Sequence, residues 1–347
     1  MKDRKFAVEG MAVLYLLSYV PYIMLTKRLS TSPAAGLGRP LSGLEILPAS
    51  LILSGVLTYL FAWVSGWWRE THLKQVGSVR LIVPSRWMVV SGICTALVLF
   101  TVPLSFTFKG VSIPFIQLLM RGDLLLIAPL VDLVNGRKVR WYSWVALGLV
   151  AVGVTATLHQ RGGLKLSGLA IATVVLYTVG YFGRLMAMTK LSKDGDVGRV
   201  KGYFVEEKLI AYPVALVLLA LIPLLGLGTQ GSELRWGFVA VWRSAQLGQL
   251  SLLAVMLFVI SIFSALILLD RRENSFCVPM ERSASIVAGI AASFLLAEYF
   301  KLPMPTNTEF VGAGLMVIAV VLLSVGPHLR RGGETDYGVR RDAKLPL

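Results

Sequence analysis

Long apolar runs dominate this 347-residue chain. A helix needs about 20 consecutive, predominantly apolar residues to cross a bilayer. Only 15% of the residues are charged, against about 25% in soluble domains, and 56% are hydrophobic. The sequence therefore predicts an all-α membrane protein. The ten predicted spans are residues 7–26, 43–66, 86–107, 111–134, 141–159, 166–188, 203–227, 247–269, 276–299 and 309–327.

Two of these spans share a sequence pattern at an offset of 162 residues. Residues 14–30 (LYLLSYVPYIMLTKRLS) and 176–192 (LYTVGYFGRLMAMTKLS) are identical at six of 17 positions, including two tyrosines. The same offset carries into the next span, where Glu45 meets Glu207. We interpret the pattern as an internal duplication, which is typical of transporters whose site lies between the repeats.

Five spans in each half mean that the second half enters the membrane from the opposite side. The predicted domains are two inverted five-helix repeats, residues 1–162 and 163–328, followed by a basic tail, residues 329–347. The loops on the side of both termini hold 21 Lys and Arg residues, and those on the other side hold 9. Because cytoplasmic loops carry the excess of Lys and Arg, both termini are predicted to be cytoplasmic.

Two segments resemble a known family. Residues 128–154 (APLVDLVNGRKVRWYSWVALGLVAVGV) look like its fourth helix, short basic turn and fifth helix. Residues 285–300 (SIVAGIAASFLLAEYF) and 309–314 (EFVGAG) look like its ninth helix, acidic turn at Glu298 and tenth helix. With ten short-looped spans, the chain resembles the drug/metabolite transporter superfamily in its EamA-like form. The resemblance implies a ten-helix inverted-repeat transporter.

Arg121 and Asp123 lie near the middle of the fourth predicted span. An ionisable side chain there costs at least ~2.5–3.5 kcal/mol to insert. Two residues apart, they point about 200° apart around a helix. Arg121 continues a polar stripe with Gln117, so we predict that both line a substrate cavity while Asp123 faces a neighbouring helix. Alternatively, Arg121 and Asp123 belong to buried ion pairs that hold helices together.

The ninth predicted span carries Glu281 and Arg282. With an offset of 161 instead of 162 residues, Arg282 is the repeat-related counterpart of Arg121. Guanidinium groups bind a carboxylate or a phosphate in bidentate fashion. We therefore predict that Arg282 also binds substrate, and that Glu281 and Asp123 act in gating or coupling.

Two repeat-related glutamates are predicted near opposite faces of the membrane, Glu45 at the outer mouth and Glu207 at the inner one. Arg184 reaches the same inner depth as Glu207. We predict an inner gate formed by these two residues, with Glu45 at the outer gate. The alternative is that such side chains snorkel to the lipid headgroups.

Four tyrosines follow an i, i+4 spacing on the two related helices. They can line a site with aromatic faces and hydroxyl groups, and we predict that they bind substrate. They are Tyr15, Tyr19, Tyr177 and Tyr181.

Several kinds of chemistry have no support in the sequence. The three histidines lie at span ends or in loops without metal-ligand spacing, so no metal and no cofactor are predicted. The two cysteines lie in apolar segments and are interpreted as packing residues. The net charge of +15 is explained by loops beside a membrane, so no nucleic-acid partner is predicted. The carboxylates are spread over several depths, which argues against an enzyme.

The sequence favours a secondary transporter that moves a small metabolite with a carboxylate or phosphate group by alternating access. The alternatives are an exporter of drugs or of neutral or cationic metabolites, and a lipid flippase or accessory subunit of an envelope pathway. The expected partners are a small-molecule substrate and membrane lipids, and the expected form is a monomer or homodimer. The expected location is a bacterial inner membrane.

Overall fold

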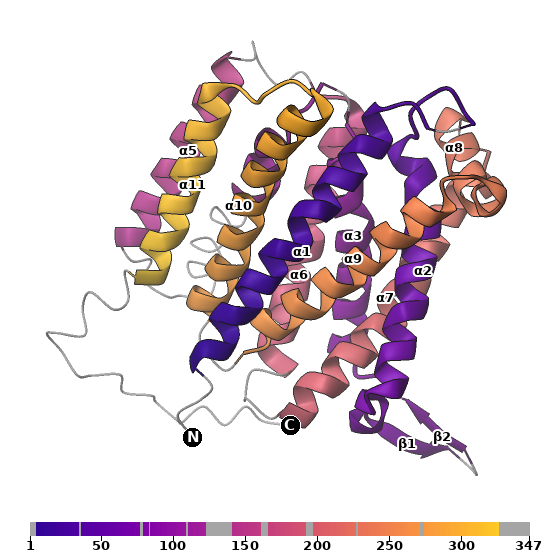
Figure 1. Cartoon of the computed structure of the whole chain (residues 1–347). Coiled ribbons are helices and arrows are strands. Elements are labelled where there is room, and N and C mark those ends of the chain that lie inside the picture. Colours follow the sequence, from indigo (N-terminus) through magenta and orange to yellow (C-terminus); the bar gives the residue numbers. More distant parts are fainter. Residues whose placement is uncertain are drawn as a thin grey trace, which may run out of the picture.

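The structure is a computed structural model that describes residues 5–34, 36–76, 79–82, 84–108, 110–122, 141–160, 166–191, 197–226, 228–270 and 274–325. Helices dominate it (Figure 1). They are α1 (Lys5–Thr31), α2 (Gly43–Val64), α3 (Arg86–Ser105), α5 (Trp141–Gln160), α6 (Gly168–Leu191), α7 (Val197–Leu224), α8 (Gly228–Val239), α9 (Leu247–Leu268), α10 (Asn274–Phe300) and α11 (Asn307–Val325). A further helical segment covers residues 113–122.

Seven of the described helices are long and apolar enough to cross a membrane: α1, α2, α3, α6, α7, α9 and α10. Shorter apolar stretches occupy Trp144–Gln160 of α5 and Asn307–Leu322 of α11. Large apolar side chains such as Leu17, Trp63 and Val311 are exposed on the outside of the bundle, as expected of surfaces that face lipid. The prediction of an α-helical, multi-pass membrane protein is confirmed. Of the fourth predicted span, only residues 111–122 are described.

Two stretches between the predicted spans fold into elements that the sequence did not predict. After α2, a 3-10 turn (Trp67–Glu70) leads into an antiparallel hairpin of β1 (Leu73–Val76) and β2 (Val79–Ile82), with Leu73 opposite Ile82. Helix α8 and a second 3-10 turn (Ala240–Arg243) precede α9. Strands of four residues and a twelve-residue helix are too short to give a periodic signal above their neighbours.

Helix α2 begins at a well-formed cap. The Ser42 hydroxyl accepts a hydrogen bond from the Glu45 backbone N–H at 3.1 Å, and the Ser42 N–H donates to the Glu45 carboxylate at 2.8 Å. Thr306 and Glu309 make the same reciprocal pair of bonds before α11. These capping boxes satisfy backbone donors that a helix start otherwise leaves without a partner.

The helices of the two predicted halves interleave. Helix α3 packs against α6 and α7, α1 packs against α9 and α10, and α5 packs against α11. The α5–α11 pair stands at the left of the bundle, with α10 between it and α1 (Figure 1). One large core cluster includes residues of α1, α2, α3, α6, α7, α9 and α10, and a smaller one joins α5 and α11 to α10. The centre of the bundle is therefore built from both halves of the chain.

A glycine permits a close contact between α6 and α3. A Cβ atom at Gly180 of α6 would lie 2.7 Å from the carbonyl oxygen of Cys94 and 2.8 Å from the Cβ of Leu97, both on α3. Small residues let membrane helices approach in this way.

Gly180→Ala is expected to destabilise the protein by about 1–3 kcal/mol, because α6 must move away from α3. The measurement is the temperature at which the detergent-purified protein loses its monodisperse state. Gly148→Ala on α5 is the matched control, since nothing lies within 4 Å of a Cβ there. Equal stability of the two variants would contradict the close α3–α6 contact.

Candidate functional site

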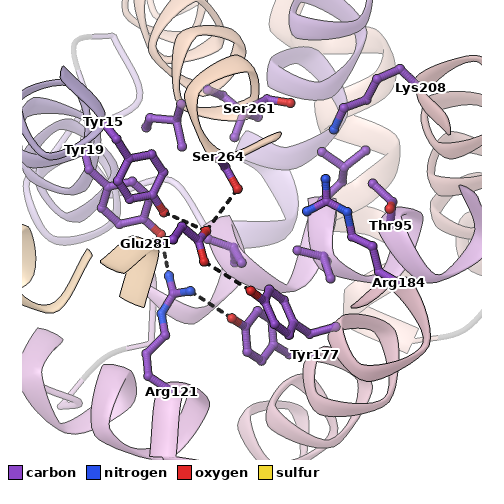
Figure 2. Close-up of a pocket in the computed structure, with 16 residues that line it drawn as sticks. Tyr15, Tyr19, Thr95, Arg121, Tyr177, Arg184, Lys208, Ser261, Ser264 and Glu281 are labelled. Carbon is purple, nitrogen blue, oxygen red and sulfur yellow. Dashed lines mark hydrogen bonds between the residues drawn. The ribbon is translucent and has the colours of Figure 1, made fainter. Parts of the chain in front are cut away.

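A pocket lies at the centre of the bundle, with about 560 Å³ of space that includes its open part. Its walls come from α1, α3, the 113–122 helix, α6, α7, α9 and α10 (Figure 2). The lining residues are Tyr15, Tyr19, Thr95, Val98, Leu99, Val102, Arg121, Tyr177, Tyr181, Arg184, Lys208, Leu257, Ile260, Ser261, Ser264 and Glu281.

Arg121 lies in this pocket, where the sequence analysis expected it. Its Nη1 donates to the hydroxyl of Tyr177 at 2.8 Å, and its Nη2 donates to the hydroxyl of Tyr19 at 2.9 Å. The side chain is buried. The two hydroxyls come from α6 and α1, so Arg121 ties together the two helices that share the repeated pattern.

Glu281 lies in the same pocket, which is a more central place than the sequence analysis gave it. Its Oε1 accepts from the hydroxyls of Ser264 at 3.0 Å and Tyr15 at 3.3 Å. Its Oε2 accepts from the hydroxyl of Tyr181 at 3.2 Å. Figure 2 shows the carboxylate between the tyrosines of α1 and those of α6. Three hydroxyl donors thus replace the water that this buried carboxylate would otherwise need.

The four tyrosines, here called the tyrosine cage, connect the arginine to the glutamate. Tyr15 stacks on Tyr19 with ring centroids 5.2 Å apart, and Tyr177 stacks on Tyr181 at 5.9 Å. Within each stacked pair, one hydroxyl accepts from Arg121 and the other donates to Glu281. The described residues show no direct ion pair between Arg121 and Glu281.

Arg282 lies behind the cage rather than among the lining residues. Its Nη1 donates to the hydroxyl of Tyr177, and its guanidinium carbon lies 3.7 Å from the centroid of the Tyr181 ring. Its Nε lies 3.7 Å from Glu281 Oε2, and neither Nε nor Nη2 makes a hydrogen bond to a described residue. The structure brings Arg282 close to Arg121 through Tyr177, but not into contact with the pocket.

Gln117 is not among the lining residues. Its Nε2 donates to the backbone carbonyl of Ser285 on α10 at 2.9 Å. The side chain fills the place that a Cβ would take at Gly289. Gln117 and Arg121, which were predicted to line one cavity together, therefore have different roles. Gln117 contacts α10, and Arg121 faces the pocket. Asp123 lies outside the described residues.

Arg184 and Glu207 form a buried ion pair at one end of the pocket. Arg184 Nε donates to Glu207 Oε1 at 2.9 Å, and Nη2 donates to Oε2 at 3.0 Å. Their side chains are 6% and 0% exposed, so neither snorkels to a headgroup. Oε1 of Glu207 also accepts from Thr95 at 2.8 Å, Ser91 at 2.9 Å and Tyr203 at 3.1 Å. The contact expected of an inner gate is present.

Glu45 lies outside the pocket, at the first turn of α2. Its two carboxylate oxygens accept from Arg39 Nη2 at 2.6 Å and Nη1 at 2.9 Å. The Arg39 side chain is half exposed, while that of Glu45 is buried. The hydrogen bond from Arg39 to this carboxylate raises the pKa of the arginine above its ordinary value. Glu45 therefore joins the N-terminal cap of α2 to the preceding loop.

Several lining residues were not singled out from the sequence. Lys208 is the most prominent, because it is buried and charged and lies next to Glu207 in the chain. Its position within a predicted span could have identified it, because a cation there is costly and therefore faces a cavity or a partner. The hydroxyls of Thr95, Ser261 and Ser264 gave no signal, because single serines and threonines are common in membrane helices.

The comparisons with known proteins establish the fold alone. The chain matches no family model and no curated protein. A solved structure described as "Crystal structure of protein" is similar over 94% of this chain and 99% of its own, with a TM-score of 0.52 and 11% identity. At that identity, the similarity supports a shared arrangement of helices and carries no statement about substrate.

Glu207→Gln is expected to destabilise the protein by about 3–5 kcal/mol, because Arg184 would be left as a buried charge without its counter-ion. The repeat-related control is Glu45→Gln, whose partner Arg39 is half exposed and whose loss should cost about 1 kcal/mol. Thermal denaturation of the two purified variants measures the difference. Equal losses would show that the Arg184–Glu207 pair is no more buried in the membrane than the Arg39–Glu45 pair.

Proposed function

We propose that the protein is a secondary transporter that moves a small metabolite with a carboxylate or phosphate group by alternating access. The observation that carries the proposal is the charge around the pocket. Four buried cations line or adjoin it, namely Arg121, Arg184, Lys208 and Arg282. Among the described residues, two carboxylates oppose them, those of Glu207 and Glu281. Excess positive charge inside a membrane bundle favours an anionic ligand.

The contacts of the tyrosine cage support an inverted repeat. The 162-residue offset exchanges Tyr15 with Tyr177 and Tyr19 with Tyr181. Arg121 bonds to Tyr19 and Tyr177, so a two-fold axis would give its counterpart bonds to Tyr181 and Tyr15. Glu281 makes those two bonds. The proposed axis thus passes through the pocket, as in transporters whose site lies between the repeats.

The proposed transporter belongs to the drug/metabolite transporter superfamily, has ten membrane-spanning helices in two inverted repeats, and resides in a bacterial inner membrane. Its termini are proposed to be cytoplasmic, on the basis of the distribution of Lys and Arg. The first residue of α1 and the last of α11 lie at the same end of the bundle (Figure 1). The Arg184–Glu207 pair joins α6 to α7, and we propose it as the inner gate in its closed state.

The pocket supports a transporter of anions better than the alternatives. A cationic drug would meet an excess of like charge, which costs free energy in a low-dielectric site. For an acid–base enzyme, the described lining supplies a single carboxylate, Glu281, already engaged by three hydroxyls. No observation among the described residues favours a flippase.

The transport test uses the purified protein in liposomes and measures uptake of radiolabelled carboxylates and phosphate esters, beside neutral and cationic compounds. Arg121→Gln is expected to abolish uptake of an anion while the protein still folds, since its hydroxyl partners remain. Arg121→Lys should weaken uptake, because a point charge replaces a planar fork. Uptake confined to cations or neutral compounds would contradict the proposed substrate class.

Arg121 can instead be purely structural. In that case Arg121→Gln would express poorly, because Glu281 would lose one of the two cations that offset its charge and keep only Arg282. Removing the acid as well, in Arg121→Gln/Glu281→Gln, would then restore both expression and transport. Recovery of both would refute a substrate-binding role for Arg121.

A further inference from the structure

Lys208 is a buried cation on α7, and no hydrogen bond or ion pair connects its Nζ to another described side chain. It is 3% exposed, and its nearest aromatic groups are the rings of Phe204 and Tyr212, 5.7 and 5.9 Å from Nζ. It lines the pocket, at a distance from Arg121 and the tyrosine cage (Figure 2). The carboxylate of Glu207 attracts this charge without a hydrogen bond or ion pair, which leaves part of its desolvation to be offset by another counter-ion.

Two other groups at the pocket have unused donors. The buried hydroxyl of Ser261 on α9 has no hydrogen-bond partner among the residues that the structure describes. Arg184 uses Nε and Nη2 to hold Glu207, and within the described part of the chain Nη1 is left over. Lys208, Ser261 and Arg184 all line the pocket. Buried donors without partners are rare in native proteins and point to a ligand.

The Arg121 side of the pocket is different. There Nη1 and Nη2 of Arg121 already donate to tyrosine hydroxyls. The charge of Arg121 is balanced by Glu281 through the tyrosine cage. An anion bound there would displace existing bonds. One bound at Lys208 would complete bonds that are not yet made.

We propose that Lys208, Arg184 and Ser261 form the subsite that binds the anionic group of the substrate. This inference rests on the proposed transport function and adds Lys208 to Arg121 as a cation that binds the anion. Apolar side chains on α3 and α9, among them Leu99, Val102 and Leu257, form the adjoining wall. The substrate class is therefore an amphipathic anion, with a carboxylate or phosphate head joined to an apolar body.

The subsite shares Arg184 with the inner gate. An anion bound at Nη1 attracts the same guanidinium that Glu207 holds through Nε and Nη2, and so weakens the pair that we propose closes the pocket. Because binding and gating involve the same cation, an occupied pocket opens inward more readily than an empty one.

The test measures the thermal stabilisation of the full-length detergent-purified protein by inorganic phosphate and by phenyl phosphate. Both are expected to raise the melting temperature, with phenyl phosphate acting at lower concentration because its ring buries apolar surface. Lys208→Gln should raise the half-saturating concentration at least about tenfold, as for one lost charge-assisted hydrogen bond. Lys208→Arg should retain the response.

The matched control is Lys190→Gln on α6, since Lys190 lies over the ring of Trp87, outside the pocket. It should respond as the unaltered protein does. Ser261→Ala, which removes only a hydroxyl, should weaken binding even if Lys208→Gln fails to fold. No stabilisation of the unaltered protein by either phosphate, or equal responses of that protein, Lys208→Gln and Ser261→Ala, would overturn the subsite.

Transport separates this inference from the function on which it rests. If no anion is taken up by liposomes while phosphate binding depends on Lys208, the transport function fails and the subsite stands. If anion uptake is unchanged in Lys208→Gln, the subsite fails and the transport function stands.

Discussion

A guanidinium and a carboxylate at the centre of this bundle are joined by tyrosines instead of touching each other. Both charges are buried, and a buried charge is tolerated only when other groups replace its water. The hydroxyls accept from Arg121 on one side and donate to Glu281 on the other. Since the four rings come from α1 and α6, the position of these two helices depends on the bridge.

The two ends of the proposed transporter differ in how they are held. The 162-residue offset aligns Glu45 with Glu207 and Tyr22 with Arg184. Both glutamates bind an arginine through two hydrogen bonds, but Glu45 takes a half-exposed one from a loop and Glu207 takes a buried one from α6. Water competes for the first pair and not for the second. The proposed inner end is therefore the more firmly closed in this conformation, and a ligand that reaches Arg184 has the greater effect there.

The sequence predicted the long apolar helices, the place of the four tyrosines and Arg121 around a cavity, and the Arg184–Glu207 contact. Each of these features leaves a strong signal. Apolar length reports a membrane span, a shared offset reports related helices, and a charge at mid-membrane reports a cavity or a partner. Gln117 was misplaced because a polar stripe looks the same whether it faces a cavity or a neighbouring helix. The sequence analysis did not place Glu281 and Lys208 at the centre of the site. Their roles arise only where α7 and α9 pack against α1 and α3, and that packing joins segments far apart in the sequence. The hairpin and α8 were too short to predict.

The central claim is that the pocket opens to each side of the membrane in turn. Ser261→Cys, with Cys94 and Cys277 replaced by serine, places a single thiol in the pocket with little change in volume. The rate of its reaction with a membrane-impermeant thiol reagent is measured from each face of oriented vesicles. We expect reaction from both faces, with Glu207→Gln accelerating it from the cytoplasmic face and slowing it from the other. Reaction from one face alone, unaltered by Glu207→Gln, would contradict alternating access.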